Sequence, residues 1–234
     1  MHAPLLAVEN LSIVAHTDDS ERTVLNNVSF TIQRGETLAL VGESGSEKSL
    51  CAQSILGLLP KPTLAIQQGK ILCDGERIDN NLPLLHRIRG KRIAMIFQEP
   101  ITALNPVQTI GEQLAEMFQL HAPNMETAAV KQQMLALLHA VNIQQAEQKL
   151  NSFPHQLSGG QCQRVMIAMA LAAKPDLLIA DEPSTALDAS TQRQLLELLQ
   201  ALQKKYQMAV LFITHDLTLV KRWCQRVAVL QKGA

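Results

Sequence analysis

One strand-to-helix junction limits the folds open to this chain more than any other stretch. The apolar run TLALV (37–41) is typical of a buried strand, and residues 49–59 have a helical pattern that stops at two prolines. Between them lies GESGSEKS (42–49), which departs from the phosphate-binding pattern G-x-x-x-x-G-K-[ST] at one position. Glu47 stands where the pattern has glycine.

A loop of this kind binds phosphates through its backbone N–H groups and the positive end of the following helix. In it, Lys48 would reach the β- and γ-phosphates and Ser49 would hold Mg²⁺. By itself the stretch is equally compatible with an ordinary strand-to-helix turn.

The pattern of apolar residues predicts an α/β protein with a largely parallel sheet. Strand-like segments open the chain, with turns predicted at Asn26–Asn27 and Arg34–Gly35, and GKILCDGERI (69–78) reads as a hairpin arm that turns at Asp74–Gly75. From Glu99 to Leu157 the apolar residues follow helical spacing, which predicts a helical insertion. Further strands are predicted at RIAMIFQ (92–98), DLLIAD (176–181), MAVLFIT (208–214) and RVAVLQ (226–231).

Composition narrows the classes of function. The 21 basic and 21 acidic residues balance, so no overall basic field points to nucleic acid. The four cysteines lie far apart without zinc-ligand spacing, and we interpret them as reduced thiols. The N-terminus lacks the features of a signal peptide, and the apolar stretch VMIAMALAA (165–173) is too short to span a membrane.

Three further segments carry polar groups next to core elements. LLIADEP (177–183) ends a strand with Asp181 and Glu182, which suits a metal-linked carboxylate and an adjacent base, although a solvated acidic turn is the better reading of this segment alone. QLSGGQCQR (156–164) places Ser158 before a helix, either as a plain N-cap or as part of an open anion site. His215 and Gln98 each follow a predicted strand and are weak signals alone.

Taken in order, these segments resemble the ATPase subunits of ATP-binding cassette (ABC) transporters. GESGSEKS, FQEP, LSGGQ, LLIADEPSTALD and THD follow one another over essentially the whole chain, and LSGGQ separates this family from other phosphate-loop proteins. The run IFQEPITALNPVQTIGEQL is similar to the peptide and nickel importer branch, within it to oligopeptide and microcin C uptake ATPases, whose polypeptides hold two cassettes in tandem. By this likeness the chain would be the first cassette.

The resemblance implies a phosphate-loop NTPase fold with a mostly parallel core sheet, an N-terminal antiparallel β subdomain and an inserted α-helical subdomain. The whole chain, 1–234, would be one ATPase domain, with 1–98 and 164–234 as the core and 99–163 as the helical subdomain that carries the LSGGQ motif. It also implies ATP and Mg²⁺ as ligands.

The resemblance assigns roles residue by residue. Glu182 would be the catalytic base, and Gln98 and His215 would sense the γ-phosphate; Ser49, Gln98 and Asp181 would serve the metal. The nucleotide would be contacted by a phosphate loop consisting of Gly42, Glu43, Ser44, Gly45, Ser46, Glu47, Lys48, Ser49 and Leu50. A signature segment consisting of Ser158, Gly159, Gly160 and Gln161 would serve the site of a second cassette, with Asp188 at the seam of that head-to-tail dimer.

The implied partners are a second cassette, transmembrane permease subunits and, indirectly, a periplasmic binding protein, with no nucleic acid. The location would be the cytoplasmic face of the bacterial inner membrane, as a peripheral subunit that is soluble when isolated. The resemblance implies uptake of peptides or peptide-like cargo. A cassette protein of translation or DNA repair is disfavoured by the neutral charge and the importer-like stretch.

Two departures from the family bear on activity. The Glu47 carboxylate adds bulk and charge beside an anionic ligand, and at roughly 5 Å and a dielectric constant of about 20 this repulsion is about 3 kcal/mol, or a few hundredfold in affinity. We therefore expect impaired nucleotide binding; the alternative is a non-hydrolysing cassette with a structural or regulatory role. Near the end of the first strand, where the family commonly stacks an aromatic ring on adenine, this chain has Ala15 and His16.

Because the family continues beyond VLQKGA (229–234), we also expect this chain to be mostly monomeric.

Overall fold

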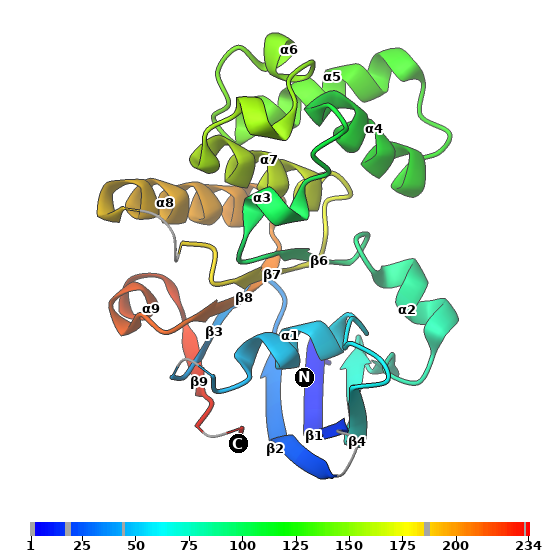
Figure 1. Ribbon diagram of the computed structural model, residues 1–234, viewed down its shortest axis with the longest axis vertical. Coiled ribbons are helices and arrows are strands. Elements are labelled where there is room, and N and C mark those ends of the chain that lie inside the picture. Colours follow the sequence, from blue (N-terminus) through cyan, green and yellow to red (C-terminus); the bar gives the residue numbers. More distant parts are fainter. Residues whose placement is uncertain (1–2, 17–19, 44, 185–187, 232) are drawn as a thin grey trace.

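The computed structural model describes residues 3–16, 20–43, 45–184, 188–231 and 233–234, and its elements form two sheets with helices around them (Figure 1). The strands are β1 (Leu6–His16), β2 (Glu21–Ile32), β3 (Thr37–Val41), β4 (Leu64–Cys73), β5 (Glu76–Arg77), β6 (Ile93–Ile96), β7 (Leu177–Asp181), β8 (Ala209–Thr214) and β9 (Arg226–Val229). The α-helices are α1 (Lys48–Ile55), α2 (Leu82–Ile88), α3 (Pro100–Ala103), α4 (Ile110–His121), α5 (Thr127–Ala140), α6 (Ala146–Lys149), α7 (Gly159–Leu171), α8 (Ala189–Tyr206) and α9 (Leu217–Trp223).

A five-stranded parallel sheet forms the centre of the fold. Its order is β6-β7-β8-β3-β9, and each strand pairs with its neighbours in parallel. Residues of β3, β7 and β8 are buried at every position, because helices or the second sheet cover both faces. This arrangement confirms the α/β class with a parallel core sheet and puts the carboxyl ends of β3, β7 and β8 at one edge.

The second sheet is antiparallel, with the order β2-β1-β4-β5, and it confirms the predicted β layer near the N-terminus. The hairpin turn at Asp74–Gly75 is confirmed as well, since both residues have positive φ and join β4 to β5. The turn predicted at Asn26–Asn27 was wrong. Strand β2 runs through both residues, because Asn27 takes a left-handed conformation at an irregularity in the pairing with β1 and donates its N–H to the Ser12 hydroxyl.

Helices α3, α4, α5 and α6 lie within the predicted helical insertion, and the helix predicted over residues 49–59 has a wrong boundary. Helix α1 ends at Ile55 rather than at Leu59, because Gly57 has a φ of +62° and the chain leaves the helix there. Helix α4 begins with a capping box in which Thr109 and Glu112 bond each other's backbone. The helices α4 and α5 form the upper part of the molecule in Figure 1, and α7 and α8 lie between them and the parallel sheet.

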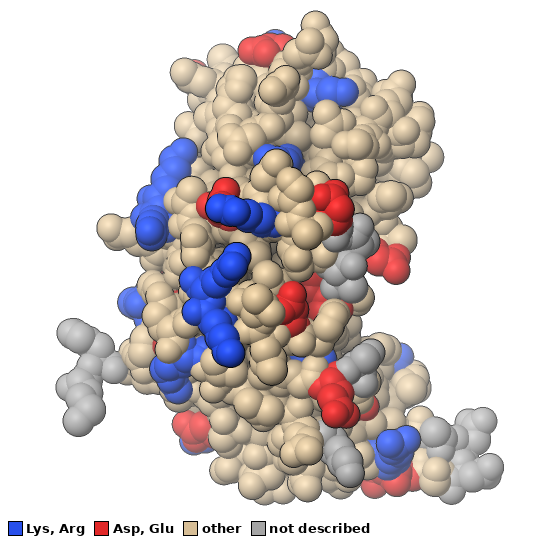
Figure 2. Space-filling model, turned by 90° about the vertical axis from the view of Figure 1, so that its left-hand side faces the viewer, with Lys and Arg blue, Asp and Glu red and all other residues tan. Residues whose placement is uncertain are grey.

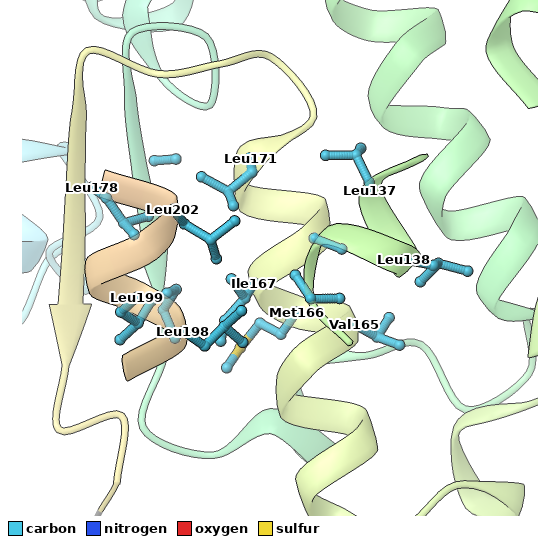
Figure 3. Close-up of a cluster of buried hydrophobic side chains, with 14 of the residues drawn as sticks. Leu137, Leu138, Val165, Met166, Ile167, Leu171, Leu178, Leu198, Leu199 and Leu202 are labelled. Carbon is cyan, nitrogen blue, oxygen red and sulfur yellow. The ribbon is translucent and has the colours of Figure 1, made fainter. Parts of the chain in front are cut away.

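Two large apolar clusters hold these layers together. One cluster joins the helical part to one face of the parallel sheet: Leu171 and Ile167 of α7 and Leu198, Leu199 and Leu202 of α8 lie close to Leu178 of β7 (Figure 3). The other cluster joins the opposite face, through residues such as Ile179 and Leu211, to the antiparallel sheet and α1. The parallel sheet is thereby covered on both sides, and its strand ends are fixed.

Charged side chains of both signs are scattered among the other residues on the surface. On the face shown in Figure 2, basic side chains gather in the middle and on the left, and acidic side chains lie mainly toward the right. Within the described residues, no helix combines the length and apolarity needed to cross a lipid bilayer.

Candidate functional site

The phosphate loop leaves the sheet edge at the end of β3 and enters α1. A Cβ added to Gly42 would lie 2.3 Å from the Leu230 carbonyl oxygen and 2.5 Å from the Ser46 hydroxyl, so only glycine fits there. Gly45 has a φ of +78°, which glycine adopts without strain. The loop therefore keeps two glycines for steric reasons that the sequence pattern does not show directly.

Lys48 is buried at the start of α1, and its ammonium group lies within the loop. Nζ donates hydrogen bonds to the carbonyl oxygens of Gly42 at 2.9 Å and Glu43 at 2.8 Å, and to the hydroxyl of Ser46 at 3.3 Å. Because these three partners are neutral oxygens, the ammonium group can exchange them for an anion that enters the loop. Ser44, predicted as part of this loop, lies outside the described residues.

Glu47 occupies a backbone position suited to glycine. Its φ of 62° and ψ of 23° are left-handed, and it precedes α1 without a side-chain cap. A non-glycine residue there costs on the order of 1–2 kcal/mol. Within the described residues, its carboxylate has no hydrogen bond or ion pair. The backbone conformation at this position thus favours the glycine of the pattern, a reason separate from the charge of the Glu47 side chain.

Ser49 and Asp181 connect α1 to the end of β7. The Ser49 hydroxyl donates to Oδ1 of Asp181 at 3.0 Å, and the Asp181 side chain is buried. Burial raises the pKa of the Asp181 carboxyl, and the neighbouring Glu182 adds to this increase. The Ser49 hydrogen bond and the Lys48 charge act in the opposite direction. A divalent cation beside Asp181 would favour the ionised form further.

Glu182, Gln98 and His215 meet at the same edge of the sheet. Strand pairing places Asp181 opposite Ile213, so Glu182 and His215 follow the ends of adjacent strands. Oε1 of Glu182 lies 3.3 Å from Nδ1 of His215, and Gln98 Nε2 donates to Oε2 of Glu182 at 3.4 Å. The two neighbours orient one carboxylate, and Glu182 itself has a positive φ of 42°.

A cavity of about 280 Å³ lies between these groups. Its walls are formed by the loop and the start of α1 on one side and by two side chains on the other. The lining residues are Gly45, Glu47, Lys48, Ser49, Leu50, Gln98 and Glu182. All seven belong to the predicted site, which the structure brings together from three separate stretches of sequence.

The signature segment (158–161) begins α7 and is not among the described residues that line this cavity. Ser158 accepts a hydrogen bond from the Gln161 N–H and donates its own N–H to the Gln161 side chain, so both form a capping box. Among the described residues, a Cβ on Gly159 would meet nothing within 4 Å, and one on Gly160 would meet a methyl group at 4.0 Å. Packing within the chain therefore gives no reason for either glycine.

Two predicted accessory residues have local partners. Asp188 caps α8 through the N–H groups of Ser190 and Thr191. His16 lies at the end of β1 with Nδ1 3.3 Å from the Glu21 carboxylate, and its stacking on adenine stays a prediction.

Sequence reasoning missed one residue, Gln163, that contacts the segment directly after Glu182. Gln163 of α7 is buried, and its side-chain amide donates a hydrogen bond to the carbonyl oxygen of Pro183, directly after Glu182. Its position two residues beyond LSGGQ was the only available signal.

The comparisons with known proteins agree with this geometry. The family model described as "ABC transporter" matches residues 25–185. The chain is 51% identical over 234 residues to the "Uncharacterized ABC transporter ATP-binding protein YejF" of Escherichia coli K12, covering all of this chain and 44% of that protein. It is 46% identical to the "Oligopeptide transport ATP-binding protein OppD" of Bacillus subtilis 168, covering 98% of this chain and 64% of that protein.

A solved structure has the same fold over nearly the whole chain. The ATP-binding cassette MJ0796, in a dimeric post-hydrolysis state bound to ADP and Pi, superposes with a TM-score of 0.84 at 29% identity, covering 97% of this chain and 95% of that one. The chain spans less than two thirds of the length of both curated relatives described above.

The fold and the loop define a phosphate-loop NTPase. The chain belongs to the ABC transporter family.

Proposed function

We propose that this chain is the ATP-binding and ATP-hydrolysing cassette of an importer. The observation that carries the proposal is the cavity between the phosphate loop, Gln98 and Glu182, into which Lys48 and Ser49 also project. It combines a cation, N–H groups at a helix start and a carboxylate across from them, which is the arrangement that phosphoryl transfer to water requires.

The oxygen groups at the cavity fit Mg²⁺. Ser49 and Asp181 already meet at 3.0 Å, and Gln98 adds a carboxamide oxygen. Among the described residues, no three His, Cys, Asp or Glu side chains gather as a metal site of their own, which agrees with an ion held by few protein ligands and by phosphates. When bound, Mg²⁺ would neutralise charge on the β- and γ-phosphates. Lys48 would exchange its carbonyl partners for phosphate oxygens.

Glu182 is the proposed general base. It would accept a proton from the water that attacks the γ-phosphate, while Gln98 and His215 hold its two oxygens in place. His215 and Gln98 would also contact the γ-phosphate, so that the two side chains that orient the base would also sense a triphosphate. The division into a core (1–98 and 164–234) and a helical subdomain (99–163) is proposed as well.

The signature segment is proposed to serve the nucleotide of a second cassette in a head-to-tail dimer. The open space around Gly159 and Gly160 supports this role, because a phosphate could approach their N–H groups at the start of α7. The dimeric state of MJ0796 with ADP and Pi supports it by likeness. Asp188 would lie at the seam of the dimer.

A second cavity, a groove of about 320 Å³, is proposed as the docking site of a transmembrane permease subunit. Its walls are largely apolar and include the methionines Met95, Met117, Met166 and Met169. Phe97 lines this groove with 40% of its surface exposed, and the next residue, Gln98, lines the nucleotide cavity. Phe97 and Gln98 thereby connect the two cavities, so that a movement caused by nucleotide binding would be transmitted to the permease.

The proposed cargo is a peptide or peptide-like compound, supported by the name of the Bacillus subtilis relative, an oligopeptide transport ATP-binding protein. A periplasmic binding protein would deliver it, and the cassette would act at the cytoplasmic face of the bacterial inner membrane. The coverage of 44% of the Escherichia coli relative fits one cassette of a tandem pair.

Glu47 is proposed to weaken nucleotide binding. Glu47 lines the cavity that Lys48 makes attractive to anions, and its left-handed backbone adds strain. These same observations favour the second candidate, a cassette that does not hydrolyse ATP and supports an active partner. Intact Asp181, Glu182, His215 and signature segment favour the first candidate.

The test measures hydrolysis and binding separately in a Glu47→Gly background. Glu182→Gln should lower kcat at least about 100-fold while ATP affinity is retained, because the base acts only in the chemical step. Glu126→Gln, the same change at an exposed helix start, is the control and should leave kcat unchanged. ATP binding without hydrolysis in Glu47→Gly itself would favour the non-hydrolysing candidate.

A further inference from the structure

Gln163 connects the signature helix to the strand that carries the proposed base. It lies in the second turn of α7, its side chain is 3% exposed, and its amide donates to the carbonyl oxygen of Pro183. The adjacent residue, Ser184, is buried too and accepts a hydrogen bond from Gln192 of α8 at 3.1 Å. The short segment after Glu182 is thus fixed by side chains from two helices.

This contact extends a continuous path that starts in the nucleotide cavity. Ser49 bonds Asp181, the main chain leads through Glu182 to Pro183, and Pro183 bonds Gln163. Apart from Ser49 and Glu182, which are half-buried, the members are buried, so a shift at one is transmitted to its neighbour rather than absorbed by solvent.

The far end of the path is the signature segment. Gln161 is two residues before Gln163, and the Ser158–Gln161 capping box fixes the start of α7. A helix of 13 residues moves as a unit, so a pull on Gln163 displaces the N–H groups at that start.

We propose that Gln163 is a positioning residue that transmits nucleotide binding in the chain's own cavity to its signature segment. The inference rests on the proposed function, because it assumes that the cavity binds ATP and that the signature segment serves the opposite site of a dimer. Since each site of such a dimer takes Glu182 from one chain and the signature segment from the other, Gln163 couples the two sites energetically.

Hydrogen exchange of the full chain tests this inference, again in the Glu47→Gly background. The reporters are the N–H groups of Gln161 and Cys162, which bond the Ser158 hydroxyl and carbonyl oxygens. Saturating Mg²⁺–ATP should slow their exchange by about fivefold or more. In Gln163→Met, which keeps the volume but removes the donor, ATP affinity by calorimetry should be unchanged and the slowing should be lost.

Gln203→Met is the matched control for lost stability. Gln203 is also buried on a helix and donates to the Gly35 carbonyl oxygen at 3.1 Å and the Thr37 hydroxyl at 2.8 Å, away from the path. This variant should lose comparable stability in urea and retain the ATP-dependent slowing.

The outcomes separate the inference from the proposed function. If ATP slows hydrogen exchange of the two reporter N–H groups as strongly in Gln163→Met as in its background, the inference is overturned and the proposed nucleotide site is unaffected. Loss of slowing in both Gln163→Met and Gln203→Met also overturns it, because general destabilisation would then explain the effect. Failure of Glu47→Gly to bind ATP overturns the proposed function and the inference together.

Discussion

The hydroxyl of Ser49 donates a 3.0 Å hydrogen bond to Oδ1 of Asp181, a residue 132 positions further along the chain. The bond joins the start of α1 to the end of β7, so the groups assigned to phosphate and to metal are in contact before any ligand enters. The charge of the buried Asp181 carboxylate, which we propose serves metal binding, therefore has a cost in stability.

Asp181→Asn should stabilise the protein at neutral pH. Because burial and Glu182 raise the pKa of Asp181, the folded protein holds the proton more tightly than the unfolded chain, and ionisation opposes folding. This cost is absent below the unfolded pKa near 3.8 and complete above the folded pKa. Urea unfolding should show a gain of roughly 1 kcal/mol at pH 7 that disappears toward pH 3.5.

Asp79→Asn should shift stability in the opposite direction. Although burial by itself would raise the pKa of Asp79, hydrogen bonds from Arg77 and the Ile71 N–H lower it, so this ionised carboxylate stabilises the fold above its unfolded pKa. The stabilisation is lost as the pH falls through the folded pKa. A loss of stability at pH 7 in Asp181→Asn, or a gain in Asp79→Asn, would contradict the electrostatic account.

Arg92→Gln should loosen the contact between the two sheets. Arg92 forms ion pairs with Asp74, which lies in the turn of the antiparallel sheet, and with Asp176, which lies just before β7. The distance from Arg92 to Asp176 is 2.7 Å. Arg34 forms a second ion pair with Asp74, also at 2.7 Å. Burial opposes ionisation of Asp74, but hydrogen bonds and charges from Arg92 and Arg34 give it a lowered pKa. At pH 7 the free energy of unfolding should fall by about 1–2 kcal/mol, measured in urea.

This deficit should shrink as the pH falls below the ordinary carboxyl pKa near 3.8, where the stabilisation of wild type is lost as well. Arg193→Gln is the control, because Arg193 and Glu197 form an exposed pair within α8 and should contribute less than about 0.5 kcal/mol. Equal losses in the two variants would refute a special role for the network.

Gly42→Ala and Gly159→Ala should separate a steric glycine from a functional one. A Cβ at Gly42 meets the Leu230 carbonyl oxygen at 2.3 Å, so this variant should lose about 2 kcal/mol or more of stability. A Cβ at Gly159 meets no atom of the described part of the chain within 4 Å, and alanine favours the helix, so the thermal unfolding temperature should be unchanged or slightly higher. Strong destabilisation by Gly159→Ala would remove the argument that this glycine is kept for a ligand outside the chain.

The strands and the site were predictable because both depend on local signals. Buried apolar runs such as residues 177–181 and 209–214 marked the core strands, and parallel pairing then brought Glu182 and His215 together at one edge. The cavity lining agrees with the predicted loop, Gln98 and Glu182.

What sequence reasoning missed depends on long-range contacts or on backbone conformation. Asn26–Asn27 has the composition of a turn, yet pairing with β1 keeps the strand continuous through a left-handed Asn27. The left-handed conformation of Glu47 and the bond from Gln163 to Pro183 also follow from tertiary structure. No local pattern in the sequence specifies either one.

The most direct test of the central claim is Mg²⁺–ATP affinity by calorimetry on this chain, Glu47→Gly and Glu47→Gln. The account predicts that glycine binds at least about 100-fold tighter than glutamate, because repulsion of about 3 kcal/mol is removed. Glutamine removes the charge but keeps the left-handed strain, so its affinity should lie between the two. Equal affinities for glutamate and glycine would contradict the account and show that the carboxylate points away from the phosphates.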